Sequence, residues 1–147
     1  MLKKNFWKKK LNQFNKEEWE ALCDRCGKCC LVKLEDEDDG NIYYTNISCK
    51  LLCVKTGNCT DYENRKKIVK DCTTLSFKNI DTLKWMPKTC SYRLISEGKK
   101  LPSWHYLLTG SFQEMEKQRM CVRNRVTNEK EIDIKKIQNY ITDWENN

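Results

Sequence analysis

The sequence has little of the apolar material from which an ordinary folded domain is built. Leu, Ile, Val and Phe together supply 31 of 147 residues, a share close to that of disordered chains. No stretch approaches the ~20 apolar residues of a membrane-spanning helix. The basic first ten residues are not followed by the apolar segment of a secretory signal peptide. We therefore expect a cytoplasmic protein with a thin hydrophobic core and no membrane partner.

Glycine, proline and histidine are also scarce, with five, two and one residues. Because neither a linker composition nor an internal repeat is visible, we expect one continuous domain over residues 15–147, preceded by a basic N-terminal arm over residues 1–14. The single histidine, His105, lies between Trp104 and Tyr106. A packed histidine with one backbone hydrogen bond is the favoured interpretation; a metal ligand or a proton-transfer group is the alternative.

The chain carries an excess of positive charge, +7 from 28 basic and 21 acidic residues. Such a balance can indicate binding to phosphate backbones. However, only six of the basic residues are arginine, the residue suited to bidentate contacts with bases and phosphates. We therefore do not expect specific nucleic-acid binding. No phosphate loop, nucleotide fingerprint or Ser-His-Asp arrangement is recognisable, so the sequence leaves open whether the protein is an enzyme.

Several short helices are predicted from capping residues and apolar spacing. Asn15 and Glu18 form a capping-box pattern that begins a helix over residues 16–22 and places Cys23 at its end. A second helix is predicted over residues 89–97, with Gly98 after it. Residues 120–126 resemble a short strand. A C-terminal helix opened by Asp133 would carry an apolar stripe of Ile134, Ile137, Tyr140, Ile141 and Trp144.

A β-hairpin is predicted near the middle of the chain. Residues 31–34 and 41–47 are rich in β-forming side chains and flank an acidic stretch that ends at Gly40. The acidic stretch lacks the spacing of a calcium-binding loop, so we interpret it as a solvated turn. Residues between Cys49 and Cys72 have no clear periodicity and require something other than apolar packing to hold them.

Cysteine is the residue that the chain has in abundance, with ten. Four fall within eight residues, in the order Cys23, Cys26, Cys29 and Cys30. Two cysteines separated by two residues can bend around one metal ion, and Gly27 after the second eases the turn. Adjacent side chains diverge, so we expect Cys29 and Cys30 to point to different places. In a reducing compartment this density of thiols indicates metal ligation rather than disulfides.

Six further cysteines lie along the chain, and four of them complete a set of eight. Two tetrahedral sites require eight thiolates, which the local four and Cys49, Cys59, Cys72 and Cys90 supply without fixing the pairing. The C-x2-C-x2-C spacing also permits an iron–sulfur cluster with a remote fourth ligand, although the usual ending is absent. Cys53 and Cys121 are interpreted as small buried hydrophobes.

The motif, together with three downstream segments, resembles the bacterial YcgN-like CxxCxxCC cysteine-cluster family. The segments are residues 43–46, 87–94 and 101–111, and the resemblance extends from Phe6 to Val126. It implies a zinc- or iron-chelating domain but no particular activity. Residue by residue, the family cysteines correspond to Cys23, Cys26, Cys29, Cys30, Cys49, Cys59, Cys72 and Cys90. Gly57 stands where relatives can have another cysteine, a role that Cys53 could take over.

The sequence thus predicts an α+β fold: a small, irregular, metal-stapled single domain with several short helices and a short β-hairpin. The predicted function is cytosolic binding of zinc or iron, with an iron–sulfur cluster as a variant. One alternative is an iron or iron–sulfur oxidoreductase. Another is a zinc-stapled module that binds nucleic acid or protein.

Overall fold

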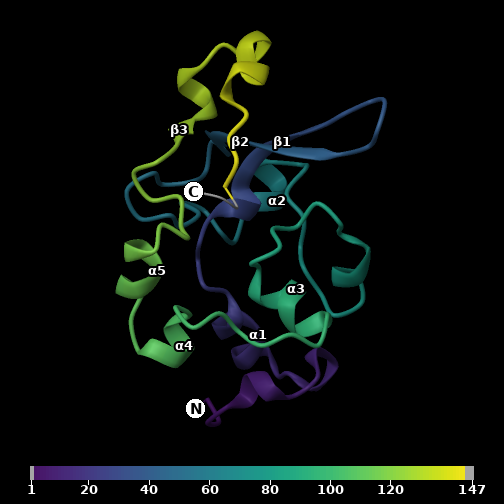
Figure 1. Cartoon of the computed structure of the whole chain (residues 1–147), viewed down its shortest axis with the longest axis vertical. Helices are drawn as coiled ribbons and strands as arrows, with labels where there is room; N and C mark the ends of the chain where they lie inside the picture. Colours follow the sequence, from purple (N-terminus) through teal and green to yellow (C-terminus); the bar gives the residue numbers. More distant parts are fainter. Residues whose placement is uncertain (1, 145–147) are drawn as a thin grey trace. The chain divides into compact units, whose positions relative to one another are not determined.

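The structure is a computed structural model that describes residues 2–144, and it has a mixed α+β fold (Figure 1). The chain divides into two compact units, each built from two separate segments. The first unit contains residues 1–24 and 73–118, and the second contains residues 25–72 and 119–147. No helix among the described residues has the length and apolar character needed to cross a membrane.

The first unit is made of short helices. Three of them are 3-10 helices and four are α-helices, as follows: η1 (Phe6–Lys8), η2 (Leu11–Gln13), α1 (Lys16–Leu22), η4 (Ile80–Thr82), α3 (Ser91–Ser96), α4 (Tyr106–Thr109) and α5 (Gln113–Lys117). The buried side chains of these helices and of the segments between them form one apolar cluster that includes Leu11, Leu22, Ile80, Met86, Cys90, Tyr92 and Leu101. Residues 6–13, part of the predicted basic arm, form η1 and η2 and bury Phe6 and Leu11.

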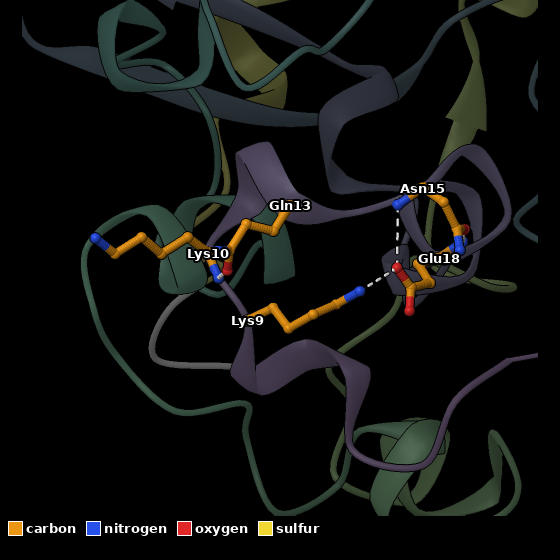
Figure 2. Close-up of polar contacts among 5 residues, drawn as sticks. All are labelled: Lys9, Lys10, Gln13, Asn15 and Glu18. Atoms are coloured by element: carbon orange, nitrogen blue, oxygen red, sulfur yellow. Dashed lines mark hydrogen bonds and ion pairs between the residues drawn. The ribbon is translucent and has the colours of Figure 1, made fainter.

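Helix α1 begins at a capping box, as the sequence predicts (Figure 2). The Glu18 N–H donates to Asn15 Oδ1 over 2.8 Å, and the Asn15 N–H donates to Glu18 Oε1 over 3.0 Å. Lys9 Nζ lies 2.6 Å from the same Glu18 oxygen. Since the Glu18 side chain is buried, the Lys9 ammonium and the Asn15 N–H together compensate its charge and hold η1, η2 and α1 in one arrangement.

The second unit contains the sheet. Its elements are η3 (Lys28–Cys30), β1 (Leu31–Glu35), β2 (Ile42–Ser48), α2 (Arg65–Ile68), β3 (Thr127–Asn128), η5 (Glu129–Glu131) and η6 (Ile134–Tyr140). Strands β1 and β2 are antiparallel, and β3 pairs parallel with the end of β2. The predicted hairpin is therefore confirmed. Its acidic turn is closed by Asp36, whose carboxylate accepts from the N–H groups of Asp38 and Asp39.

The core of the second unit joins both of its segments. Leu31, Leu52, Val122, Val126 and Trp144 pack together. The Trp144 indole N–H donates to the Thr45 carbonyl over 3.0 Å, and Arg125 lies over the Trp144 ring. The C-terminal segment is thereby fixed to strand β2.

Three predicted elements differ in the structure. The helix over 89–97 is confirmed as α3, but it begins at Ser91. The predicted strand over 120–126 is wrong, because Asn124 has a left-handed backbone (φ 57°) and the Val122 N–H donates to the Cys26 carbonyl instead of a neighbouring strand. The strand, β3, follows at Thr127–Asn128.

The C-terminal helix is opened by Asp133 as predicted, but it is the 3-10 helix η6. It ends at Tyr140, because Ile141 pairs with Thr45 and the Thr142 N–H donates to the Tyr44 carbonyl. None of the residues of η6 is buried, so tertiary packing does not stabilise an α-helix there. Ile134 and Ile141 of the predicted stripe are exposed, while Trp144 is buried.

Glu18 should make stability depend on pH in a defined range. The Lys9 ammonium and the Asn15 N–H hold the pKa of Glu18 below its ordinary value of 4.5. A lowered pKa in the folded state stabilises the protein above the unfolded-state pKa, and this contribution is lost as the pH falls through the lowered value. Urea unfolding from about pH 5 to about pH 3 should therefore show a shallower loss of stability in Glu18→Gln, which keeps the acceptor and removes the charge. Parallel pH profiles for the two proteins would contradict this.

Gly27 should be far less replaceable than Gly40. Both have left-handed backbones (φ 80° and 72°), but a Cβ at Gly27 would lie 2.5 Å from Val122 Cγ2, while a Cβ at Gly40 would meet nothing within 4 Å. Backbone strain alone predicts a cost of about 1 kcal/mol for Gly40→Ala, and strain plus overpacking predicts about 2–4 kcal/mol for Gly27→Ala. Equal losses in urea unfolding of the two metal-free variants would refute the packing argument.

Candidate metal centre

The eight candidate ligands are distributed between the two units. Cys23 and Cys90 belong to the first unit. The second unit contains the other six, which are Cys26, Cys29, Cys30, Cys49, Cys59 and Cys72. All ten cysteines of the chain are free thiols in the structure.

The hairpin register brings Cys30 next to Cys49. Cys30 directly precedes β1 and Cys49 directly follows β2, and Leu31 pairs with Ser48 across the two strands. The Cys49 N–H donates to the Cys30 carbonyl over 2.7 Å. Two cysteines that are 19 positions apart in the sequence thus become neighbours because the strands that join them are antiparallel.

Cys29 and Cys30 do not diverge, and the prediction that they point to different places is wrong. Both lie in the 3-10 helix η3, whose tighter winding changes the side-chain directions that an extended chain would give. Their side chains share a hydrogen bond, which raises the pKa of the Cys30 thiol; burial and the charges of Cys29 and Cys49 raise it further. The two thiols therefore lie within hydrogen-bonding reach of each other, although Cys29 is exposed and Cys30 is half-buried.

Cys59 and Cys72 join this group from the irregular segment after β2. An isolated bridge pairs Leu52 with Cys59, and the Thr60 N–H donates to the Leu51 carbonyl over 2.7 Å. Burial raises the pKa of Cys49, with smaller contributions from the charges of Cys72 and Cys59. Burial likewise raises the pKa of Cys72, and the charges of Cys29 and Cys59 raise it further. Five thiols thus influence one another electrostatically.

Cys26 lies at the tight turn of the motif. Arg25 and Gly27 on either side of it have left-handed backbones, with φ values of 60° and 80°. The Cys26 side chain is buried, and its carbonyl accepts from the Val122 N–H over 2.8 Å. Val122 therefore anchors the motif to the core of the second unit.

Lys33 is a residue that the sequence analysis missed. Its ammonium donates to the carbonyls of Cys29 and Leu31 over 3.0 and 2.7 Å and lies over the Tyr44 ring. Burial lowers the pKa of Lys33, and the charges of Cys29, Cys30 and Cys26 raise it. Its ammonium therefore faces the motif. A lysine between Val32 and Leu34, directly after a cysteine motif, was the available sequence signal.

The donor chemistry fits zinc or iron, because both ions accept tetrahedral sets of thiolates. The side chains do not form a closed set of this kind: within residues 2–144, no group of three or more His, Cys, Asp and Glu side chains is arranged to hold a metal ion. What the structure brings together is the hydrogen-bonded pair of Cys29 and Cys30, with Cys49, Cys59 and Cys72 within electrostatic range.

The two cysteines outside the set behave differently from each other. Cys121 is 2% exposed, which confirms its interpretation as a small buried hydrophobe. Cys53 is only half-buried, so the same interpretation is wrong there. The Thr56 hydroxyl and the backbone N–H groups of Thr56 and Lys55 donate to Cys53 and lower its pKa. The same turn contains Gly57, whose N–H donates to the Cys53 carbonyl over 2.8 Å.

In the first unit, Cys23 and Cys90 flank a buried histidine network. Cys23 is the residue after α1 and Cys90 the residue before α3, and both pack in the apolar cluster of that unit. His105 is fully buried, as the packed-histidine interpretation predicts, but its ring contacts two backbone groups rather than the one predicted. Burial lowers its pKa. Its Nδ1 accepts from the Leu107 N–H, so the neutral ring carries its proton on Nε2, which lies 3.1 Å from the Leu22 carbonyl and 2.9 Å from Ser91 Oγ.

The sequence of this chain matches a family model and a group of similar proteins. The family model described as "CxxCxxCC: Putative zinc- or iron-chelating domain" matches residues 22–91. A UPF0260 protein of Parvibaculum lavamentivorans is 48% identical over 140 residues, covering 95% of this chain and 92% of its own. One from Pseudomonas entomophila is 50% identical over 129 residues, covering 87% of each chain. No solved structure matches the chain.

Both relatives are similar to this chain over most of its length. The region that matches the family model, residues 22–91, contains the five cysteines that lie beside the hairpin. The chain therefore belongs to the UPF0260 family, and its residues 22–91 match the CxxCxxCC family model.

Proposed function

We propose that this protein binds zinc or iron through the thiolates of its CxxCxxCC motif and of four distant cysteines. The proposed ligands are Cys23, Cys26, Cys29, Cys30, Cys49, Cys59, Cys72 and Cys90. The observation that carries the proposal is the convergence of five thiols at the end of the hairpin, which are those of Cys29, Cys30, Cys49, Cys59 and Cys72. Burial and the neighbouring thiols raise the pKa values of three of them, Cys30, Cys49 and Cys72. Thiols gathered in this way are costly to ionise together unless a cation joins them.

A metal ion supplies that cation. A divalent ion held by four thiolates has a net charge of −2, so a positive side chain nearby stabilises the loaded site. Lys33 is suited to this role, because its ammonium is fixed by the Cys29 and Leu31 carbonyls and faces the motif cysteines. The motif thus has both the donors and the counter-charge that such a centre requires.

Binding would bring the thiols closer together than they lie in the structure. The segment from Cys49 to Cys72 contains only the short helix α2 and one isolated bridge, and Leu52 is its one buried residue in the apolar cluster of the unit, so little side-chain packing opposes its movement. Metal binding and the ordering of this segment would then be one equilibrium. We place the protein in the cytosol as part of the same proposal, since reducing conditions keep thiols available to metal.

Cysteine-to-serine variants test the ligand set directly. Anaerobically purified Cys30→Ser and Cys59→Ser should lose at least about half of the bound metal, because each removes one thiolate from a shared centre. Cys121→Ser is the matched control, since Cys121 is a buried thiol outside the set, and it should keep its full metal content. Metal analysis by mass spectrometry gives the stoichiometry.

The absorption spectrum of the same samples identifies the occupant. Zinc gives no visible band, whereas mononuclear iron or an iron–sulfur cluster gives thiolate-to-iron absorption. If the wild-type protein contains no zinc and no iron, or if Cys30→Ser and Cys59→Ser retain as much metal as Cys121→Ser, the proposal is wrong.

A further inference from the structure

Helix α1 is too short to stabilise its own C-terminal end. It has seven residues, and its last carbonyls have no partners within the helix. Side chains from later in the first unit supply them: the Tyr92 hydroxyl donates to the Trp19 carbonyl over 2.5 Å, and the Tyr106 hydroxyl donates to the Ala21 carbonyl. The Leu22 carbonyl, directly before Cys23, accepts from His105 Nε2 over 3.1 Å.

The His105 nitrogen Nε2 has a second partner. Nε2 also lies 2.9 Å from Ser91 Oγ, and Ser91 is the first residue of α3, directly after Cys90. One N–H group therefore joins the residue before Cys23 to the residue after Cys90. The ring is itself held by the Leu107 N–H at Nδ1 and has no exposed surface, so it has little freedom to turn.

We propose that His105 is the positioning residue that holds Cys23 and Cys90 as a pair of neighbouring thiols, and that this pair supplies two of the metal ligands. The second part rests on the proposed function. The two cysteines pack in the same apolar cluster, and each lies one peptide bond from a group that His105 Nε2 contacts. The Tyr92 hydrogen bond to the Trp19 carbonyl also joins α1 to α3, but it lies one turn before Cys23. Losing the Nε2–H would therefore leave the helices packed and release the link next to the two thiols, which would then separate.

A thiol cross-linker tests the pairing without metal. Reduced, metal-free full-length protein is treated with dibromobimane, which joins thiols that lie near each other, and is digested with trypsin. Cleavage at lysine and arginine releases Cys23 within residues 17–25 and Cys90 within residues 89–93, and each peptide contains one cysteine. The joined peptide therefore reports this pair alone.

Three variants separate positioning from general stability. His105→Leu should lower the yield of the joined peptide at least about five-fold, whereas His105→Gln, which keeps an N–H donor, should restore most of it. Thr45→Val removes a buried hydroxyl from the second unit and should leave the yield unchanged. If His105→Leu does not fold, Ser91→Ala, which removes one of the two Nε2 partners, should lower the yield in its place.

The outcomes are distinct. An absent Cys23–Cys90 product in the wild type, or an equal yield in the folded His105→Leu or Ser91→Ala variant, overturns the positioning role. His105→Leu should also weaken metal affinity as much as Cys23→Ser does, measured by chelator competition; wild-type affinity would overturn the ligand role of the pair. Failure of the proposed function is seen separately, as a wild-type protein without metal.

Discussion

The antiparallel pairing of β1 with β2 is the interaction on which the site depends. Its register sets Leu31 opposite Ser48, and the hydrogen bond from the Cys49 N–H to the Cys30 carbonyl continues it by one step. A shift of one residue would move Cys49 away from the motif and turn the strand faces over. The backbone bridge between Leu52 and Cys59 then holds the segment that follows β2. Backbone pairing, first in the hairpin and then in this segment, thus brings the thiols together.

Because the chain has little apolar content, hydrophobic packing contributes little to the stability of this arrangement. Each unit has a small core, and the segment from Cys49 to Cys72 contributes only Leu52 to the buried residues of the cluster in its unit. A chain of this kind gains stability when a bound ion replaces packing that it lacks. Lys33 and Cys30 show the cost of the same arrangement without metal. Burial lowers the pKa of Lys33, and the hydrogen bond with Cys29 together with burial raises the pKa of Cys30, so both are shifted away from the charged forms that a loaded site uses.

Local features were predictable from the sequence, and long-range ones were not. Asn15 and Glu18 mark the start of α1 because a capping box involves only neighbouring residues, and the acidic turn marks the hairpin for the same reason. The orientation of Cys29 and Cys30 depends on a 3-10 turn that no residue pattern indicates. Val122 donates to the Cys26 carbonyl, 96 positions away, so the sequence did not indicate that the predicted strand over 120–126 is absent. His105 contacts the Leu22 carbonyl, 83 positions away, so the link between Leu22 and Ser91 could not be foreseen either.

X-ray absorption at the metal edge of the anaerobically purified protein tests the central claim most directly, because it identifies the atoms around the ion. The account predicts a first shell made of sulfur, with four scatterers at about 2.3 Å if the metal is zinc. A first shell dominated by nitrogen or oxygen would contradict it, since the cysteines gathered by the hairpin would then not be the ligands.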